Sequence, residues 1–161
     1  TLDPNPPGQD EADVSPLVGT PAHPFTMKML EGEDFKLTAA KGKVVVLDFW
    51  ASWCAPCVRS LPLVLDAMAG FPPDKVAFLA VNQGETPEQV KQFMNVRGFV
   101  MPVGFDPEMT VGKSFGVDSI PYTVVIDPAG TVTYISLGAS PDGATKLAEA
   151  VTKALDATAS E

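Results

Sequence analysis

The sequence predicts an α/β protein in which helices cover both faces of a central mixed β-sheet, with an N-terminal β-hairpin added to it. Apolar runs of strand length alternate with stretches whose apolar residues recur at helical spacing, which favours parallel strands joined by helices. One pair of short segments near the start and another toward the end flank turn residues, which favours antiparallel hairpins. With 161 residues, 45% of them hydrophobic, the chain can bury a core as one domain.

Residues 1–16 differ from the rest of the chain in composition. They are rich in proline and in acidic residues and contain few apolar ones, so we expect a disordered linker or tether. Residues 17–161 are expected to form the folded domain. No charged-then-apolar leader follows Thr1, which leaves either a cytosolic protein or one whose leader or anchor precedes this sequence.

The first expected elements are a hairpin and a buried strand. Segments 25–29 and 35–37 alternate apolar and polar residues on either side of an acidic turn at 31–34, which is typical of a hairpin. Residues 43–50 form an apolar run interrupted only by Asp48. Such a run predicts a strand that is buried on both faces and pairs in parallel.

Helix signals follow that strand. Pro56 suits the first turn of a helix that continues to about Gly70, and Pro62 inside it is expected to cause a kink. Thr86 followed by Pro87 predicts the start of a second helix. The same patterns predict strands at 76–81, 103–105, 122–126 and 131–137, and further helices at 107–115 and 142–155.

The charge of the chain limits its partners. The net charge is −9, and seven of the acids but only one base lie within residues 1–34. No basic patch exists, so nucleic acid is not expected as a partner, and the acidic surplus favours solubility. No apolar run is long enough to span a membrane.

The two cysteines, Cys54 and Cys57, lie at the end of the buried strand and the start of the first helix. A disulfide across two intervening residues closes a very short loop, so it contributes little as a structural staple. Two thiols with no nearby histidine are too few for a closed zinc site, because His23 is distant in the sequence. Reversible oxidation of a dithiol is the chemistry that remains, and no metal is expected.

Two motifs give the chain a resemblance to the thioredoxin superfamily. The first is Trp53-Cys54-Ala55-Pro56-Cys57, and the second is Ile120-Pro121-Tyr122-Thr123, a proline directly before a strand. The resemblance covers about residues 17–157 and implies a thioredoxin-like fold.

Within that superfamily the chain most resembles the TlpA/ResA branch of extracytoplasmic thiol–disulfide oxidoreductases. Three stretches carry this likeness: the hairpin leading into residues 42–46, the run Val81-Asn82-Gln83-Gly84-Glu85, and the run from Phe115 to Thr123. Tyr122 departs from the residue that is commoner there. Because that position is expected to border the docking groove, the departure is expected to alter the fit of a substrate.

The resemblance assigns roles around the dithiol. Cys54 is expected to be the exposed attacking thiol, with its pKa lowered by the start of the helix. Cys57 is expected to resolve the mixed disulfide. Pro121 is expected to follow a cis peptide bond, which sets the backbone of Ile120 beside Cys54 to pair with an extended substrate segment. The remaining docking residues implied are Trp53, Ala55 and Pro56.

Two acids are expected near the dithiol. Asp48 interrupts the buried strand, and burial should raise its pKa. We interpret it as the proton acceptor for Cys57. Glu85 is a second candidate by resemblance. The lysine that pairs with the buried acid in typical thioredoxins is missing, and Phe78 fills its place.

The function implied by the resemblance is reduction of protein disulfides outside the cytoplasm, with cytochrome c maturation as one setting. The location would be the periplasm or the outer face of the cytoplasmic membrane, with a tether preceding Thr1. The Cys54–Cys57 pair would serve without a cofactor, since no GxGxxG motif is present. A membrane thiol carrier would supply the electrons, and we expect a monomer.

Two other functions are known for proteins with related folds, a thiol peroxidase and a metal- or partner-binding module. A thiol peroxidase needs a threonine one turn before its reactive cysteine, but Ala51 and Trp53 occupy that approach. A metal- or partner-binding module of the same fold, such as a copper carrier, would use a CxxxC spacing and a further histidine. A peroxide turnover assay and a metal titration separate these alternatives from a disulfide reductase.

Overall fold

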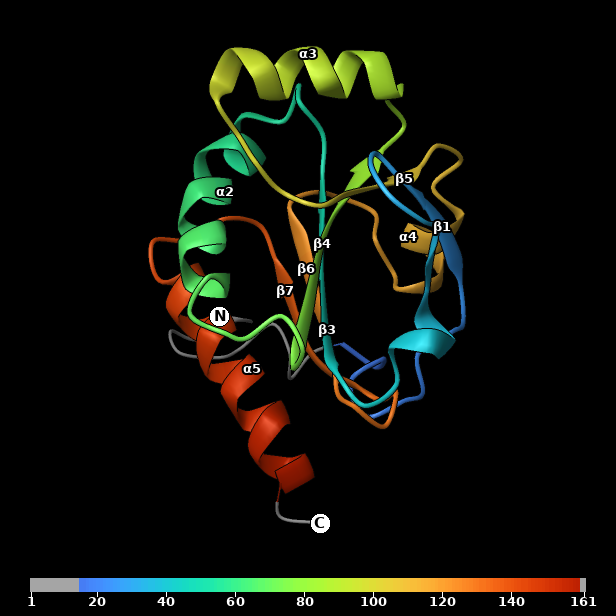
Figure 1. Ribbon diagram of the computed structural model, residues 1–161. Coiled ribbons are helices and arrows are strands. Elements are labelled where there is room, and N and C mark those ends of the chain that lie inside the picture. Colours follow the sequence, from blue (N-terminus) through green and yellow to red (C-terminus); the bar gives the residue numbers. More distant parts are fainter. Residues whose placement is uncertain (1–14, 160–161) are drawn as a thin grey trace, which may run out of the picture.

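The computed structural model describes residues 15–159, and a β-sheet forms its centre (Figure 1). The strands are β1 (Thr26–Met29), β2 (Phe35–Lys36), β3 (Val44–Trp50), β4 (Val76–Gln83), β5 (Val103–Asp106), β6 (Tyr122–Ile126) and β7 (Val132–Leu137). The helices are the 3-10 helix η1 (Leu37–Ala40), α2 (Ala55–Met68), α3 (Pro87–Arg97), α4 (Thr110–Ser114) and α5 (Gly143–Ala159). The linker predicted for residues 1–16 lies outside the described residues, apart from its last two.

The sheet is mixed, as predicted, with seven strands in the order β2-β1-β5-β4-β3-β6-β7. Strands β3, β4 and β5 run parallel, and helices α2 and α3 connect them. Strand β6 pairs antiparallel with β3 and with β7, so the C-terminal hairpin attaches to the centre of the sheet. The N-terminal hairpin attaches at the other side, where β1 pairs antiparallel with β5.

All seven residues of β3 are buried, which confirms the strand predicted from the apolar run. Its residues alternate between two cores. Val45, Leu47 and Phe49 belong to one core, whereas Val44 and Val46 pack with apolar residues of α2 and α5. Asp48 has the same parity as Val44 and Val46, so its side chain lies on the α2 and α5 face of the sheet.

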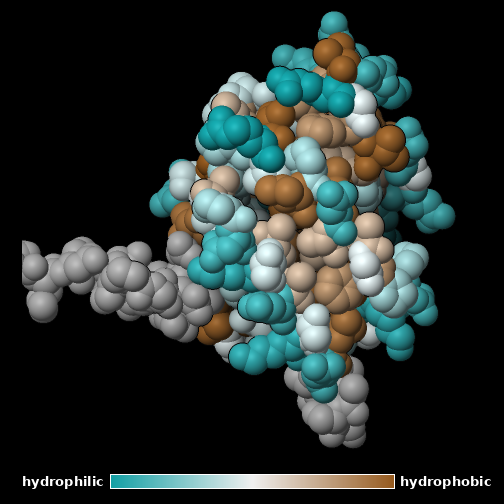
Figure 2. All heavy atoms as spheres, turned by 90° about the vertical axis from the view of Figure 1, so that its left-hand side faces the viewer, coloured by the Kyte–Doolittle hydropathy of each residue, from teal (hydrophilic) through white to brown (hydrophobic). Residues whose placement is uncertain are grey.

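Helices cover both faces of the sheet, as the sequence predicts. Helices α2 and α5 lie against one face, α4 lies on the opposite side, and α3 crosses the end of the sheet where α2 begins (Figure 1). Figure 2 views the molecule from the side of α2 and α5, where apolar residues are dispersed among hydrophilic ones. No helix within residues 15–159 is both long and apolar enough to cross a membrane.

Local signals in the sequence set both ends of α3. Helix α3 begins with a capping box, in which the Thr86 side chain accepts from the N–H of Gln89 and the Gln89 side chain accepts from the N–H of Thr86. It ends at Gly98, which has the left-handed conformation that favours glycine. The kink expected at Pro62 stays a prediction, although Pro62 does lie inside α2.

Several boundaries differ from the sequence predictions, and three of these elements show the largest changes or a clear local cause. The second hairpin strand is only two residues long, because Leu37 begins a 3-10 helix. The helix expected over 107–115 spans only Thr110–Ser114, since Met109 takes a left-handed conformation just before it. Buried Asp106 then accepts hydrogen bonds from the N–H groups of Val111 and Gly112 at its start. Helix α5 extends to Ala159, four residues further than predicted.

Candidate active site

Cys54 and Cys57 form a disulfide at the start of α2, directly after the central strand β3. Their Cα atoms are 5.3 Å apart. Cys54 is the N-cap residue of α2, and its Sγ accepts a hydrogen bond from the N–H of Cys57 at 3.3 Å. The sulfur therefore occupies the position that a serine or aspartate oxygen usually takes at a helix start, where unpaired N–H groups favour negative charge.

Both cysteines are largely buried. Cys54 is 5% exposed and Cys57 is 1% exposed, so the expectation of an exposed Cys54 is wrong for the disulfide form. The reason is packing, because Cys54 lies in an apolar cluster with Trp50 and Leu61 that Ile120 partly covers. The exposed group of this loop is the neighbouring Trp53, at 69%.

A segment far along the chain completes the face around the disulfide. The Ile120–Pro121 peptide bond is cis, as the resemblance implied. The carbonyl oxygen of Ile120 lies 3.8 Å from Cys54 Sγ, and Ile120 itself precedes the ladder of β6. Of the residues expected to dock a substrate, Trp53 and Ala55 are exposed, Pro56 and Ile120 are half-buried, and Pro121 is buried.

Tyr122 does not line this face, contrary to the expectation that it borders a docking groove. Its side chain is buried, its ring packs edge-on against Phe49, and its hydroxyl donates a hydrogen bond to the carbonyl of Phe115 at 2.6 Å. Burial and the nearby Asp118 charge raise the pKa of Tyr122, so the hydroxyl stays a donor. The tyrosine therefore joins the segment before Pro121 to the core rather than to a substrate.

Asp48 is a buried carboxyl group without a partner. It is 2% exposed, and within residues 15–159 no hydrogen bond or ion pair to its side chain is found. Burial raises its pKa from 3.8 to about 7. On the neighbouring strand β4, Ala80 lies opposite Asp48 and Phe78 lies opposite Val46. Apolar residues therefore stand beside Asp48 where typical thioredoxins have a lysine.

Glu85 lies beside the loop that precedes Cys54, but its contacts are not with sulfur. Its carboxylate accepts hydrogen bonds from the N–H of Ser52 at 2.8 Å, from the Ser52 hydroxyl at 2.5 Å and from the Asn82 amide at 2.9 Å. These bonds lower its pKa despite the opposing effect of partial burial. The proton-carrier role suggested for Glu85 stays a prediction, and the lowered pKa argues against it.

Ser52 and Asn82 are the site residues that the sequence analysis missed. Asn82 is fully buried at the end of β4, and its side-chain oxygen also accepts from the N–H of Glu85. A fully buried asparagine at the end of an apolar strand needs partners, and that was the signal available in the sequence. Together Ser52, Asn82 and Glu85 form a clamp that ties the loop before Cys54 to the loop before α3.

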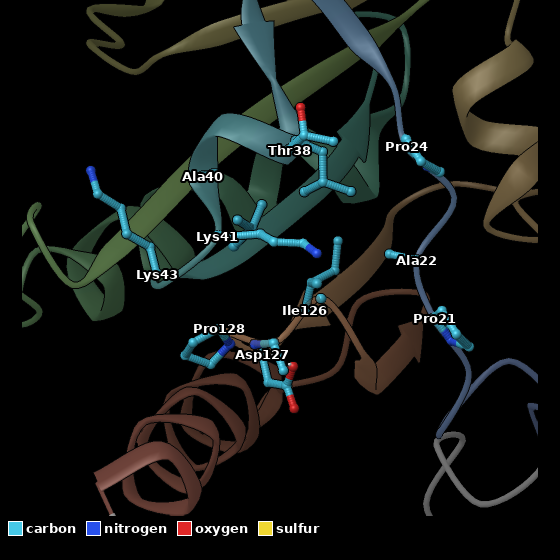
Figure 3. Close-up of a pocket in the computed structure, with 14 residues that line it drawn as sticks. Pro21, Ala22, Pro24, Thr38, Ala40, Lys41, Lys43, Ile126, Asp127 and Pro128 are labelled. Carbon is cyan, nitrogen blue, oxygen red and sulfur yellow. Dashed lines mark hydrogen bonds between the residues drawn. The ribbon is translucent and has the colours of Figure 1, made fainter. Parts of the chain in front are cut away.

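Other parts of the described chain do not add to this site. Within residues 15–159 no three His, Cys, Asp or Glu side chains are grouped as a metal site requires. A crevice of about 160 Å³ is lined by Pro21, Lys41 and Asp127, among others, and Lys41 extends across it (Figure 3). It lies where β3 begins and β6 ends, which is the end of the sheet away from the disulfide.

The fold and the site define the class of protein. A cysteine pair separated by two residues caps the first helix after the central strand, and a cis-proline segment from the other half of the chain lies against it. This is a thioredoxin-like protein with a redox-active disulfide.

Comparison with known proteins gives the family. Residues 18–135 match the AhpC/TSA family, and the chain belongs to it. It is 36% identical over 121 residues to the thiol-disulfide oxidoreductase ResA of Geobacillus thermodenitrificans, covering 75% of this chain and 70% of that one. It is 33% identical over 120 residues to ResA of Bacillus subtilis, covering 74% and 67%.

A solved structure shows the same likeness. The crystal structure of a protein described as a putative thiol:disulfide interchange protein DsbE from Chlorobium tepidum superposes with a TM-score of 0.78. The two chains are 30% identical, over 86% of this chain and 97% of that one. Together with the Cys54–Cys57 disulfide, these relatives make the protein a thiol–disulfide oxidoreductase.

The raised pKa of Asp48 predicts a pH-dependent stability. A carboxyl group that titrates near 7 when folded and near 3.8 when unfolded destabilises the protein as pH rises between those values. Asp48→Asn should therefore raise the free energy of unfolding by on the order of 4 kcal/mol above neutral pH, and by progressively less toward acid pH. Chemical denaturation of the oxidised protein across this pH range measures the effect, with exposed Asp66→Asn as the control. An equal gain at all pH values would contradict it.

The clamp predicts a second effect. Glu85→Ala leaves the buried Asn82 amide without its acceptor and frees Ser52, so we expect the free energy of unfolding to fall by roughly 1–3 kcal/mol. Because the folded-state pKa of Glu85 is lowered, the loss should be largest at neutral pH and should diminish as acid protonates the wild-type carboxylate. Glu88→Ala, an exposed acid on α3, is the matched control. If both variants unfold alike in denaturant at neutral pH, the clamp has no role in stability.

Proposed function

We propose that this oxidoreductase works as a reductase of protein disulfides outside the cytoplasm. The observation that carries the proposal is the position of Cys54, whose Sγ accepts the N–H of Cys57 at a helix start beside the Ile120 carbonyl. In the dithiol form the same N–H groups and the helix dipole favour a thiolate at Cys54, which is the nucleophile for disulfide exchange.

The reaction proceeds in two exchanges. The Cys54 thiolate attacks one sulfur of the substrate disulfide, a mixed disulfide forms, and the other substrate sulfur leaves as a thiolate. Cys57 then loses its proton to Asp48 and attacks Cys54 Sγ, which breaks the mixed disulfide and releases the second substrate thiolate. Two electrons pass from the dithiol to the substrate, and the Cys54–Cys57 disulfide remains.

The surroundings of Cys57 support Asp48 as its proton acceptor. Both residues are buried. Asp48 lies on the face of the sheet that α2 covers, and α2 is the helix that carries Cys57. A carboxyl group with a pKa of about 7 takes up and releases a proton near neutral pH. A carboxyl group with an ordinary pKa would hold that proton too weakly to serve a thiol.

An extended protein segment is the substrate that this face suits. Ile120 precedes the β6 ladder, so its backbone can pair with a substrate strand beside Cys54. Trp53, exposed beside the disulfide, offers an apolar contact for such a segment. Protein disulfides are therefore favoured over small-molecule disulfides.

We infer the direction of the reaction from the two residues between the cysteines, and the location and the electron donor from the resemblance to ResA and DsbE proteins. Ala55 and Pro56 place no charge between the cysteines, which favours a reducing pair over an oxidising one. The likeness to ResA and DsbE relatives supports a place outside the cytoplasm, in the periplasm or on the outer face of the cytoplasmic membrane, with disulfides of cytochrome c precursors as one substrate class. A membrane thiol carrier would return the electrons, and the protein would act as a monomer.

Single cysteine variants test the two-exchange mechanism. Cys54→Ser should abolish reduction of a disulfide-bearing peptide, because the resolving thiol alone is buried. Cys57→Ser should accumulate a mixed disulfide with the same peptide, detectable as a mass increase that dithiothreitol reverses. Normal turnover by Cys54→Ser would show that the order of attack is wrong.

The reduction potential of the Cys54–Cys57 pair tests the direction. A reductase should have a potential near that of thioredoxin, about −270 mV, whereas a disulfide-forming enzyme should lie near about −120 mV. Equilibration in a series of dithiothreitol redox buffers, followed by thiol alkylation, measures it. A potential near about −120 mV would overturn the reductase assignment while leaving the exchange chemistry intact.

A further inference from the structure

A row of polar residues crosses three neighbouring strands at Asp48. Thr123 on β6 lies directly opposite Asp48 on β3, and Ser136 on β7 lies directly opposite Thr123. Residues directly opposite each other in antiparallel strands project on the same side of the sheet. The row therefore runs from the centre of the sheet to its edge strand on a single face.

On these three strands, the next residues of that face toward α5 are apolar or aromatic. On each strand, the residue two positions from the row member projects on the same face and packs with α2 and α5. These residues are Val46 on β3, Val125 on β6 and Tyr134 on β7. Three polar side chains in register thus interrupt the apolar layer beneath two helices. Buried polar groups without partners are costly, so the row calls for a physical explanation.

A cavity follows the row. Its volume is about 30 Å³, and it is lined by Asp48, Thr123 and Ser136 together with Ser60 of α2 and Ser140 before α5. A water molecule needs roughly 10–15 Å³ and two or more polar partners, and the cavity offers both. Exposure rises along it, since Asp48 is buried, Thr123, Ser136 and Ser60 are half-buried, and Ser140 is exposed.

We propose that the proton carried by Asp48 exchanges with solvent along this row, by way of Thr123, Ser136 and water in the cavity, at the side of the molecule between α2 and β7. The proposal rests on the role of Asp48 as proton acceptor for Cys57. Thr123 and Ser136 are positioning residues, because they hold the water that receives the proton and do not touch the sulfurs.

The opposite route is blocked by the disulfide face itself. Cys54 and Cys57 are nearly buried, and a docked protein segment would cover Trp53 and Ile120 as well. Along the row, the proton that Cys57 gives to Asp48 can reach water even while that segment is still in place, because the substrate does not cover this path. Substrate docking and proton exchange thus use different sides of Asp48.

The row is also free of competing charges. Apart from Asp48, none of the residues lining the cavity is charged. Arg59 and Asp66 on α2 and Lys146 on α5 belong to the helices above it but lie outside its lining. On β4 the residue opposite Asp48 is Ala80. A change in proton exchange caused by altering the row is therefore not a change in a neighbouring charge.

Proton release during a single turnover tests the proposal. The reduced protein is mixed with an excess of an aromatic disulfide whose thiolates stay ionised at neutral pH, so the proton counted is the one from Cys57. Absorbance of the second thiolate reports electron transfer, and a pH indicator reports arrival of the proton in water. In the wild type the two signals should coincide. In Thr123→Val and Ser136→Ala the proton should appear in water after the second thiolate, with a rate constant about tenfold lower than that of thiolate release.

The controls separate this proposal from the proposed role of Asp48. Thr133→Val, an exposed position on β7, should show no lag. Asp48→Asn should slow release of the second thiolate, and if it does not, the acceptor role of Asp48 is wrong. If Asp48→Asn slows that step but the protons of both Thr123→Val and Ser136→Ala arrive on time, the route is wrong. A lag that persists when Thr123→Val is combined with Asp48→Asn would likewise overturn it.

A second measurement is independent of turnover. Carbon-13 NMR of the oxidised protein follows the titration of the Asp48 carboxyl. Removing a hydroxyl from the row should raise the pKa of Asp48 further, because the carboxylate loses polar surroundings. Thr133→Val should leave that pKa unchanged. If the Asp48 titration curves of Thr123→Val and Ser136→Ala both equal that of the wild type, the role of the row is contradicted.

Discussion

The complete burial of β3 between β4 and β6 is the constraint on which the active site depends. It holds Cys54 just beyond the C-terminal end of this central strand, where the cis-proline segment that leads into β6 lies beside it. It also buries the Asp48 carboxyl group on the face of the sheet that α2 and α5 cover. The reactive sulfur and the titrating acid are thus positioned by the same seven residues.

Most of the framework could be predicted from the sequence, because its signals are local. The apolar run of β3, the capping box before α3 and the hairpin turns each depend on a few adjacent residues. The cysteine spacing and the proline at 121 indicated the site before any geometry was known. The central strand, the cis peptide bond, the exposure of Trp53 and the raised pKa of Asp48 agree with those expectations.

Long-range pairing explains what the sequence did not show. The contacts of Glu85 join residues from two loops, and nothing near Ser52 indicates a carboxylate partner. The burial of Cys54 and of Tyr122 depends on how Ile120, Phe49 and Phe115 pack after the strands are assembled. The row from Asp48 to Ser136 exists only in the register of three strands, so no pattern along the chain could reveal it.

The two edges of the sheet have a consequence for association between copies of the chain. Strand β2 is only two residues long, and the start of β7 is covered by the segment around Pro21, where Gly19 and Thr20 bond to Val132. Long unpaired edges are templates for pairing with another chain, and short or covered edges remove that template. At β2 and at the start of β7 the sheet therefore offers little template for pairing with another copy, and the net charge of −9 adds mutual repulsion between copies.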